Sequence, residues 1–173
     1  ARAVLWGKPA ADDASAEVLL DRTVVRVHGN GLGERFVQRL VHARTERAAR
    51  DSREARVRFE PGRQEVEIRK ARILRRGPDG RLEVSEATGR DEESLSEPWY
   101  GLYYDTRAAV VTFENVRAGD VVEVQYTVVD VGYRNELADY FGDLEIIADV
   151  WPTRRWDYTL IAPSHRTFYF NQL

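Results

Sequence analysis

Apolar and polar residues alternate with a period of two along most of this chain, and this alternation constrains its fold more than any other feature. In the clearest run, residues 122–128, apolar side chains alternate with Glu123, Gln125 and Thr127. A period of two places one set of side chains on a buried face of a β-strand and the other on a wet face. β-branched residues, which dominate this run, favour strands. The pattern begins at about Val18 and predicts an all-β fold, an antiparallel β-sandwich.

Turn signals separate the strands of the first half. The run at 57–59 is followed by Pro61-Gly62, and the run at 66–74 is followed by Gly77-Pro78-Asp79-Gly80; both are typical of turns. Within the second run the apolar positions change parity after Arg69. One extra residue in a strand has this effect, so the sequence predicts a β-bulge near Arg69-Lys70. A short return strand is expected at 82–84.

Two further connections and a last strand are expected in the second half. Residues 115–119, after the apolar run 108–113, predict a hairpin connection to the strand that contains Val122. Runs 144–151 and 156–162 predict another antiparallel pair, joined through Pro152-Thr153. Phe168 and Phe170 are expected to open a last strand.

One segment has two interpretations. Phe36, Val37, Leu40 and Val41 have the spacing of a helical stripe as well as the composition of a strand. Residues 46–55 are rich in Ala, Arg and Glu, which favour helix. Residues 34–53 are therefore either one helix or a strand followed by a short helix.

The length of 173 residues suits one domain, and 43% hydrophobic with 32% charged residues indicates a folded globule. No run approaches the roughly 20 apolar residues of a membrane span, and no signal peptide is evident. The sequence begins at Ala1 and contains no Met. We therefore expect a piece of a longer chain, with residues 1–17 as an N-terminal extension or linker and 18–173 as the β-sandwich domain.

The chain contains no cysteine, which excludes disulfides, thiolate metal sites and a cysteine nucleophile within it. Its formal net charge of −3 argues against nucleic-acid binding, which favours a basic domain. His28, His42 and His165 are scattered without metal-ligand spacing, so no metal or cofactor is expected.

Two motifs have plain structural interpretations. The glycine-rich segment 29–33 lacks the Lys-Ser/Thr of a phosphate loop, and Asn30-Gly31 predicts a hairpin turn with positive φ. The acidic residues around Asp139 and Asp143 lack the regular spacing of a calcium loop, so a solvated loop is expected. The sequence shows no catalytic signature, although a carboxylate pair acting in a hydrolase is a third, weaker hypothesis.

The candidate binding residues are four aromatic side chains in a loop-like segment: Trp99, Tyr100, Tyr103 and Tyr104. Exposed loop aromatics often mark surfaces that bind a ligand or a partner. The alternative is that they cap the core of the sandwich. The sequence leaves both interpretations open.

The order of these features resembles the β-rich domain of unknown function that precedes the transglutaminase-like core in many bacterial proteins. The resemblance covers nearly all of the chain after about Val18. It rests on the following segments: Val57-Arg58-Phe59-Glu60-Pro61, residues 65–74, Pro78-Asp79-Gly80, Tyr104-Asp105-Thr106-Arg107, residues 116–123 with Arg117-Ala118-Gly119-Asp120, Val150-Trp151-Pro152 and residues 158–163.

The resemblance implies an immunoglobulin-like sandwich, a strand at 36–43 and at most one short helix near 46–53. It places the catalytic Cys, His and Asp in a following domain, so no catalytic residue carries over to this chain. It also implies a bacterial periplasmic or envelope-associated location.

The resulting hypothesis is a non-catalytic accessory domain of a transglutaminase-like protein. Its partners would be the downstream transglutaminase-like domain and a protein or peptide substrate. The alternative is a carbohydrate-binding β-sandwich that uses the four loop aromatics as a stacking platform. Binding of a glycan that is lost on Trp99→Ala, with the fold intact, would support that alternative.

Overall fold

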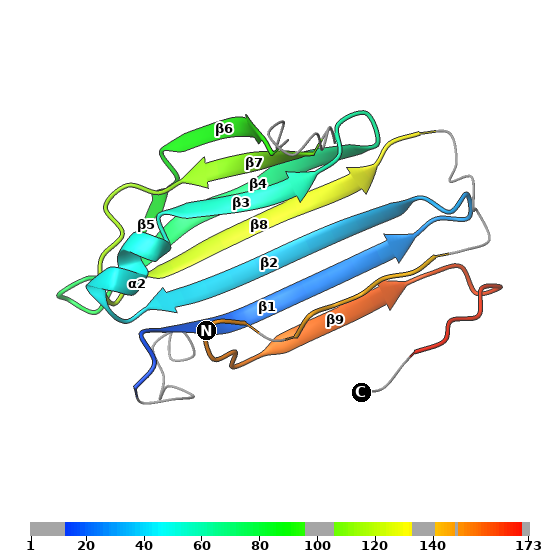
Figure 1. Cartoon of the computed structure of the whole chain (residues 1–173). Helices are drawn as coiled ribbons and strands as arrows, with labels where there is room; N and C mark the ends of the chain where they lie inside the picture. The colour runs from blue at the N-terminus through cyan, green and yellow to red at the C-terminus, as the bar shows by residue number, and fades with distance from the viewer. Residues whose placement is uncertain (1–12, 96–105, 133–140, 148, 171–173) are drawn as a thin grey trace.

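The computed structural model describes residues 13–95, 106–132, 141–147 and 149–170. Within them, two β-sheets pack against each other as an all-β sandwich (Figure 1). The larger sheet has the order β5-β4-β8-β2-β1-β9 and consists of β1 (Ala16–Val27), β2 (Gly33–Ala43), β4 (Gln64–Arg76), β5 (Leu82–Glu86), β8 (Val121–Asp130) and β9 (Trp156–Ile161). The smaller sheet has the order β3-β7-β6 and consists of β3 (Glu54–Phe59), β6 (Gly89–Ser94) and β7 (Arg107–Thr112). The described helix is α2 (Glu46–Asp51), which is too short to cross a membrane, and no other described helix could do so.

β1 and β2 form the hairpin that the glycine-rich segment predicts. The His28 amide donates to the Leu32 carbonyl over 2.8 Å, and the Gly31 amide donates to the His28 carbonyl over 3.1 Å. The left-handed conformation falls on Gly31, with φ of 81°, and not on Asn30. The turn is confirmed, with a glycine where positive φ is required.

The ambiguous segment is a strand followed by a short helix, as the family resemblance implied. β2 pairs along its length with both β1 and β8, so tertiary pairing overrides the helical spacing of its apolar residues. α2 begins after Thr45, whose hydroxyl accepts a hydrogen bond from the Ala48 amide at 3.2 Å. Ala48 and Ala49 are the buried residues of this helix.

β4 contains the predicted β-bulge, because its pairing with β8 shifts register between Ile68 and Lys70. The predicted turn at 77–80 is confirmed, with the Gly77 amide bonded to the Arg81 carbonyl. β5 returns antiparallel to β4.

The expected hairpin between the runs at 108–113 and 122–128 is wrong. β7 pairs with β3 and β6, whereas β8 pairs with β2 and β4, so residues 113–120 cross from the smaller sheet to the larger one. Phe113 and Val116 are buried in the core along this crossing. Asp120 fixes the end of this crossing, because its carboxylate accepts hydrogen bonds from the Arg75 guanidinium of β4 and from the Arg117 amide, at 2.6–2.8 Å.

The expected antiparallel pair at the C-terminal end is also wrong. β9 is a strand, but it pairs in parallel with β1, and the described residues of 144–151 are outside any strand. Backbone hydrogen bonds from Val18 to Pro152 and from Arg154 to Val18 align this part of the chain with β1. The strand expected at Phe168 and Phe170 is absent from residues 163–170, where the chain turns after Pro163 instead.

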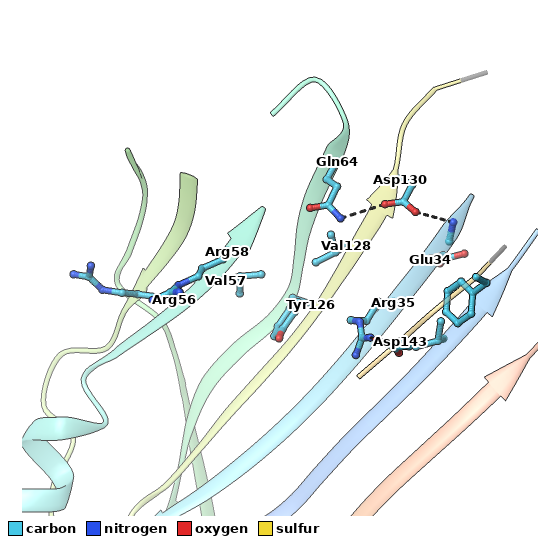
Figure 2. Close-up of a pocket in the computed structure, with 13 residues that line it drawn as sticks. Glu34, Arg35, Arg56, Val57, Arg58, Gln64, Tyr126, Val128, Asp130 and Asp143 are labelled. Atoms are coloured by element: carbon cyan, nitrogen blue, oxygen red, sulfur yellow. Dashed lines mark hydrogen bonds and ion pairs between the residues drawn. The ribbon is translucent and has the colours of Figure 1, made fainter. Parts of the chain in front are cut away.

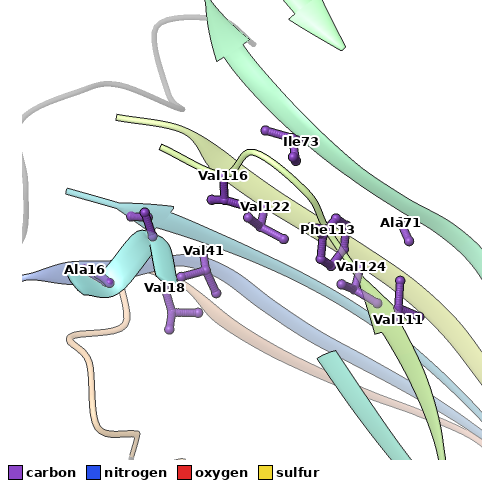
Figure 3. Packing of buried hydrophobic residues seen from close by; sticks show 13 residues of the cluster. Ala16, Val18, Val41, Ala71, Ile73, Val111, Phe113, Val116, Val122 and Val124 are labelled. Atoms are coloured by element: carbon purple, nitrogen blue, oxygen red, sulfur yellow. The ribbon is translucent and has the colours of Figure 1, made fainter. Parts of the chain in front are cut away.

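The core lies between the two sheets, on what we call the inner face of the larger sheet. Three apolar residues lie side by side on neighbouring strands: Val41 on β2, Val122 on β8 and Ile73 on β4. They pack with Val111 of β7 and with Phe113 at the start of the crossing (Figure 3). Leu40, Val121 and Leu74 alternate with them and form a second cluster on the outer face. The larger sheet is therefore apolar on both faces at the end where β2 ends and β8 begins, and α2 lies beside that end (Figure 1).

Candidate functional site

The four aromatic residues singled out from the sequence, Trp99, Tyr100, Tyr103 and Tyr104, lie outside the described residues. Other aromatics of the second half are placed. Trp151 packs against the core cluster, and the rings of Trp156 and Tyr158 stack on β9 with centroids 6.1 Å apart.

The described part of the chain contains an open cleft of about 390 Å³ between the smaller sheet and the far end of the larger one (Figure 2). Figure 2 shows Tyr126 and Val128 of β8 in its floor, with Val57 of β3 on one side and Asp143 on the other; Phe141 also lines it. Asp130 and Gln64 lie at its mouth, where the Gln64 amide donates to Asp130 over 3.2 Å.

The arginines around this cleft do not converge on a shared point. Arg56 and Arg58 alternate with Val57 on β3, so their side chains leave the opposite side of that strand, and Figure 2 shows Arg56 directed away from the cleft. Arg56 forms ion pairs of 3.0 Å with both Glu54 and Glu93. Arg35 is bound to acidic residues of another segment, so the cleft presents no preformed site for an anionic ligand.

That segment, residues 141–147 and 149–151, is called the strap below. It runs over the β2-β1-β9 part of the larger sheet, on the inner face, where the smaller sheet does not extend (Figure 1). Because Arg35 and Arg39 share the parity of Val37 and Val41 on β2, they point to this face. The inner face thus changes from apolar to charged along β2.

Ion pairs attach the strap to the sheet. Arg35 binds Asp143 and Glu145, and Arg39 binds Asp149 as well as Asp21 of β1, the latter at 2.6 Å. The carboxylate side chains of the strap are only 19–22% exposed. Of the acidic residues noted in the sequence around Asp139 and Asp143, Asp143 and Glu145 are therefore partners of Arg35; Asp139 lies outside the described residues.

Two pKa shifts follow from this arrangement. Burial and a 2.8 Å hydrogen bond to Asp143 raise the pKa of the Tyr158 hydroxyl, which stays protonated as a donor. Burial alone would raise the pKa of Asp149, but hydrogen bonds from Arg39 and from backbone amides outweigh it and hold that pKa below its usual value. Asp149 therefore attaches the strap as an ionised carboxylate at neutral pH.

The opposite side of the strap is apolar and faces solvent. Leu144, Ile146, Ile147 and Val150 are 85, 76, 58 and 88% exposed. We call these four residues the apolar ridge. Sequence reasoning missed it because residues 144–151 were predicted to be one strand of an antiparallel pair. The structure instead turns the acidic side chains toward Arg35 and Arg39 and exposes the aliphatic ones.

The histidines stay apart from one another and from the cleft. His42 is half-buried on the outer face beside Glu17 and Arg154, and burial lowers its pKa. His28 lies in the β1–β2 turn and His165 in the turn after β9. Among the described residues, no group of three or more His, Asp or Glu side chains is arranged to hold a metal ion.

Comparison with known structures shows where else this fold occurs. The crystal structure of "a putative protease" from Parabacteroides distasonis matches with a TM-score of 0.67 and 16% identity, covering 87% of this chain and 29% of that one. Yeast LTA4 hydrolase in complex with bestatin matches with a TM-score of 0.35 and 13% identity, covering 72% of this chain and 18% of that one; this likeness is too weak to support an argument. The chain thus spans less than a third of the length of either protein.

Sequence comparison identifies the family. No curated protein matches the sequence significantly. The model of DUF3857, a domain of unknown function with solved structures, matches residues 29–173. Because that match takes in β2 and every later element of both sheets, the chain belongs to the DUF3857 family.

Proposed function

We propose that this chain is a non-catalytic accessory domain of a larger transglutaminase-like protein that acts on peptide bonds. In this role it positions the catalytic domain or binds its protein substrate. The observation that carries the proposal is the use made of its reactive side chains: the sequence has no cysteine, and its buried carboxylates are each bound to an arginine of the fold.

The three most deeply buried carboxylates illustrate this point. Glu17 binds Arg154, Asp120 binds Arg75 and Glu123 binds Arg72, each with a shortest distance of 2.6 Å, and each carboxylate side chain is at most 3% exposed. A general acid or base needs access to substrate and a pKa near the working pH. These groups are enclosed and paired, so they support a structural role.

The comparisons support an accessory role in a larger protein. The chain resembles 29% of the Parabacteroides distasonis protein, so in that "putative protease" the fold is a minor part of a longer chain. The DUF3857 family match agrees with the resemblance drawn from the sequence. The two comparisons support a place in a longer protein, and the transglutaminase-like neighbour itself is proposed from the resemblance found in the sequence.

The test begins with the full-length open reading frame and the protein it encodes. We expect a downstream domain with a Cys, a His and an Asp. Its peptide-bond activity and thermal stability are then measured with and without the DUF3857 domain. Loss of stability or a changed substrate range on deletion would support the proposal. Unchanged stability, activity and substrate range would refute it.

A further inference from the structure

The apolar ridge is held in a defined position rather than on a loose loop. Asp143 and Glu145 bind Arg35, and Asp149 binds Arg39, so an acidic side chain of the strap contacts the sheet on either side of Ile146 and Ile147. Trp151 packs against the core at the end of the strap. Preorganisation of this kind lowers the entropic cost of binding a partner.

The exposure of the ridge is unusual for this protein. Of the eight large hydrophobic residues that are exposed among those described, four belong to these few positions of the strap. Contiguous apolar patches on a soluble surface mark interaction sites. Each carboxylate next to the ridge is ion-paired with Arg35 or Arg39 and turned toward the sheet, so the side chains offered to a partner are aliphatic.

The size of the ridge determines which occupant it suits. A stable complex of free partners buries roughly 800 Å² on each side and uses about 20–30 residues. Four aliphatic side chains fall well short of that. A domain tethered in the same polypeptide needs less contact, because the tether supplies an effective concentration on the order of millimolar.

The location of the ridge agrees with a tethered occupant. The strap lies over β1 and β9, beside the segment that follows β9 and carries the exposed Tyr169 and Phe170 (Figure 1). In the Parabacteroides distasonis protein the similar fold is joined to more than twice its own length of further chain. A neighbouring domain has an apolar surface to rest on at this edge of the sandwich.

From these observations we infer that the apolar ridge, Leu144, Ile146, Ile147 and Val150, is the docking contact for a second domain of the same polypeptide, which covers it with an apolar groove. This inference rests on the proposed function only in requiring a longer protein. It adds the surface by which the accessory domain holds its neighbour.

Hydrogen exchange on the full-length protein tests the inference. The strap lies outside any strand or helix. If no partner covers the ridge, the amides of the strap should therefore exchange near the rate of an unstructured peptide. Docking should slow exchange at 144–147 by at least about tenfold. The paired variant Ile146→Ser with Ile147→Ser should restore fast exchange there and leave exchange in β8 unchanged.

Val84→Ser is the matched control, because Val84 is a 48% exposed aliphatic residue on β5, at the other edge of the larger sheet. It should leave strap exchange slow. Fast exchange at 144–147 in the wild-type protein would overturn the inference without any variant. Protection that rises with protein concentration would also overturn it, because a second copy would then cover the ridge.

The outcomes separate this inference from the proposed function. If deletion of the domain alters activity but strap amides exchange freely, docking at the ridge is wrong and the accessory role stands. If the strap is protected but deletion changes nothing in stability, activity or substrate range, the accessory role is wrong and the docking stands. A reading frame that encodes no further domain would overturn both.

Discussion

Replacement of Glu123 by glutamine tests whether the buried carboxylate on the outer face stabilises the larger sheet. Its side chain is 3% exposed, and one oxygen accepts hydrogen bonds from Gln38 at 2.7 Å and from Gln125 at 2.6 Å. The other oxygen accepts from the Arg72 Nε at 2.6 Å. Every partner of this carboxylate is a donor, so both of its oxygens are needed.

The magnitude follows from the donor count. Glutamine keeps one oxygen for the two amides but turns an NH2 group toward the Arg72 guanidinium, so Glu123→Gln loses a charge-assisted hydrogen bond and buries an unsatisfied donor. A hydrogen bond to a charged group contributes about 1.5–3 kcal/mol, and a buried orphan costs about 1–3 kcal/mol. Because Arg72 is 29% exposed and can turn to water, we expect a total of about 3 kcal/mol. For a chain of this size, that lowers Tm by about 6–12 °C.

The pH dependence gives an independent check. Burial alone would raise the pKa of Glu123, but hydrogen bonds from Gln125, Arg72 and Gln38 outweigh burial and hold the pKa below its usual value. A carboxylate whose pKa is lowered in the folded state contributes stability above its unfolded pKa, about 4.3. That contribution is lost as pH falls from there through the folded pKa, so the difference between wild type and Glu123→Gln should shrink in acid.

The assay is urea unfolding of both proteins at several pH values between neutrality and about pH 3, which spans the usual carboxylate range. Glu67→Gln is the control, because Glu67 lies on the same face but is 69% exposed, and it should change stability by less than about 0.5 kcal/mol. A Glu123→Gln protein as stable as wild type at neutral pH would refute the hydrogen-bond argument. A difference that stays constant in acid would refute its electrostatic part.

Three further predictions can be checked on the same protein. Phe113→Ala empties a fully buried position in the crossing between the sheets and should cost about 3–5 kcal/mol in urea unfolding, whereas a cost below about 1 kcal/mol would mean the crossing is not packed. Thr45→Ala removes the N-cap of α2 and should cost about 1 kcal/mol by the same measurement, without loss of the β-sheet circular dichroism signal. Asp149→Asn removes the ion pair with Arg39, so protease cleavage within residues 143–151 should be faster in the variant at neutral pH. Because the pKa of Asp149 is lowered, the cleavage rate of the wild type should approach that of the variant only in acid. Equal cleavage rates at neutral pH would contradict the role of the ion pair.

Local features of the fold could be predicted from the sequence because their causes are local. The Asn30-Gly31 turn and the bulge near Arg69 each follow from a few adjacent residues, and the structure confirms both. The short helix from Glu46 was one of two interpretations of the local pattern, and only the family resemblance favoured it. The parallel pairing of β9 with β1 could not be predicted in this way, since it joins residues more than 130 positions apart. The crossing at Phe113 was mistaken for a hairpin for the same reason, because nothing local distinguishes a turn within one sheet from a passage between two.

The strap was missed for a different reason, although the sequence did contain a signal. In β2 the inner-face positions run Arg35, Val37, Arg39, Val41, so two arginines occupy the face that is apolar farther along the strand. Charged residues on a face that packs against another layer need partners of opposite charge. The acidic residues at 143–149 supply those partners, about 110 positions away.

The unequal sizes of the two sheets explain why the strap exists. Strands lie about 4.8 Å apart, so the six strands of the larger sheet span about 24 Å, whereas the three strands of the smaller sheet span about 10 Å. More than half of the inner face therefore lies beyond the reach of the smaller sheet. The strap covers part of this region: its carboxylates turn toward Arg35 and Arg39, and its aliphatic residues point outward. The apolar ridge is thus a consequence of how the sandwich is closed, and a docked neighbour would supply the layer that the smaller sheet is too narrow to provide.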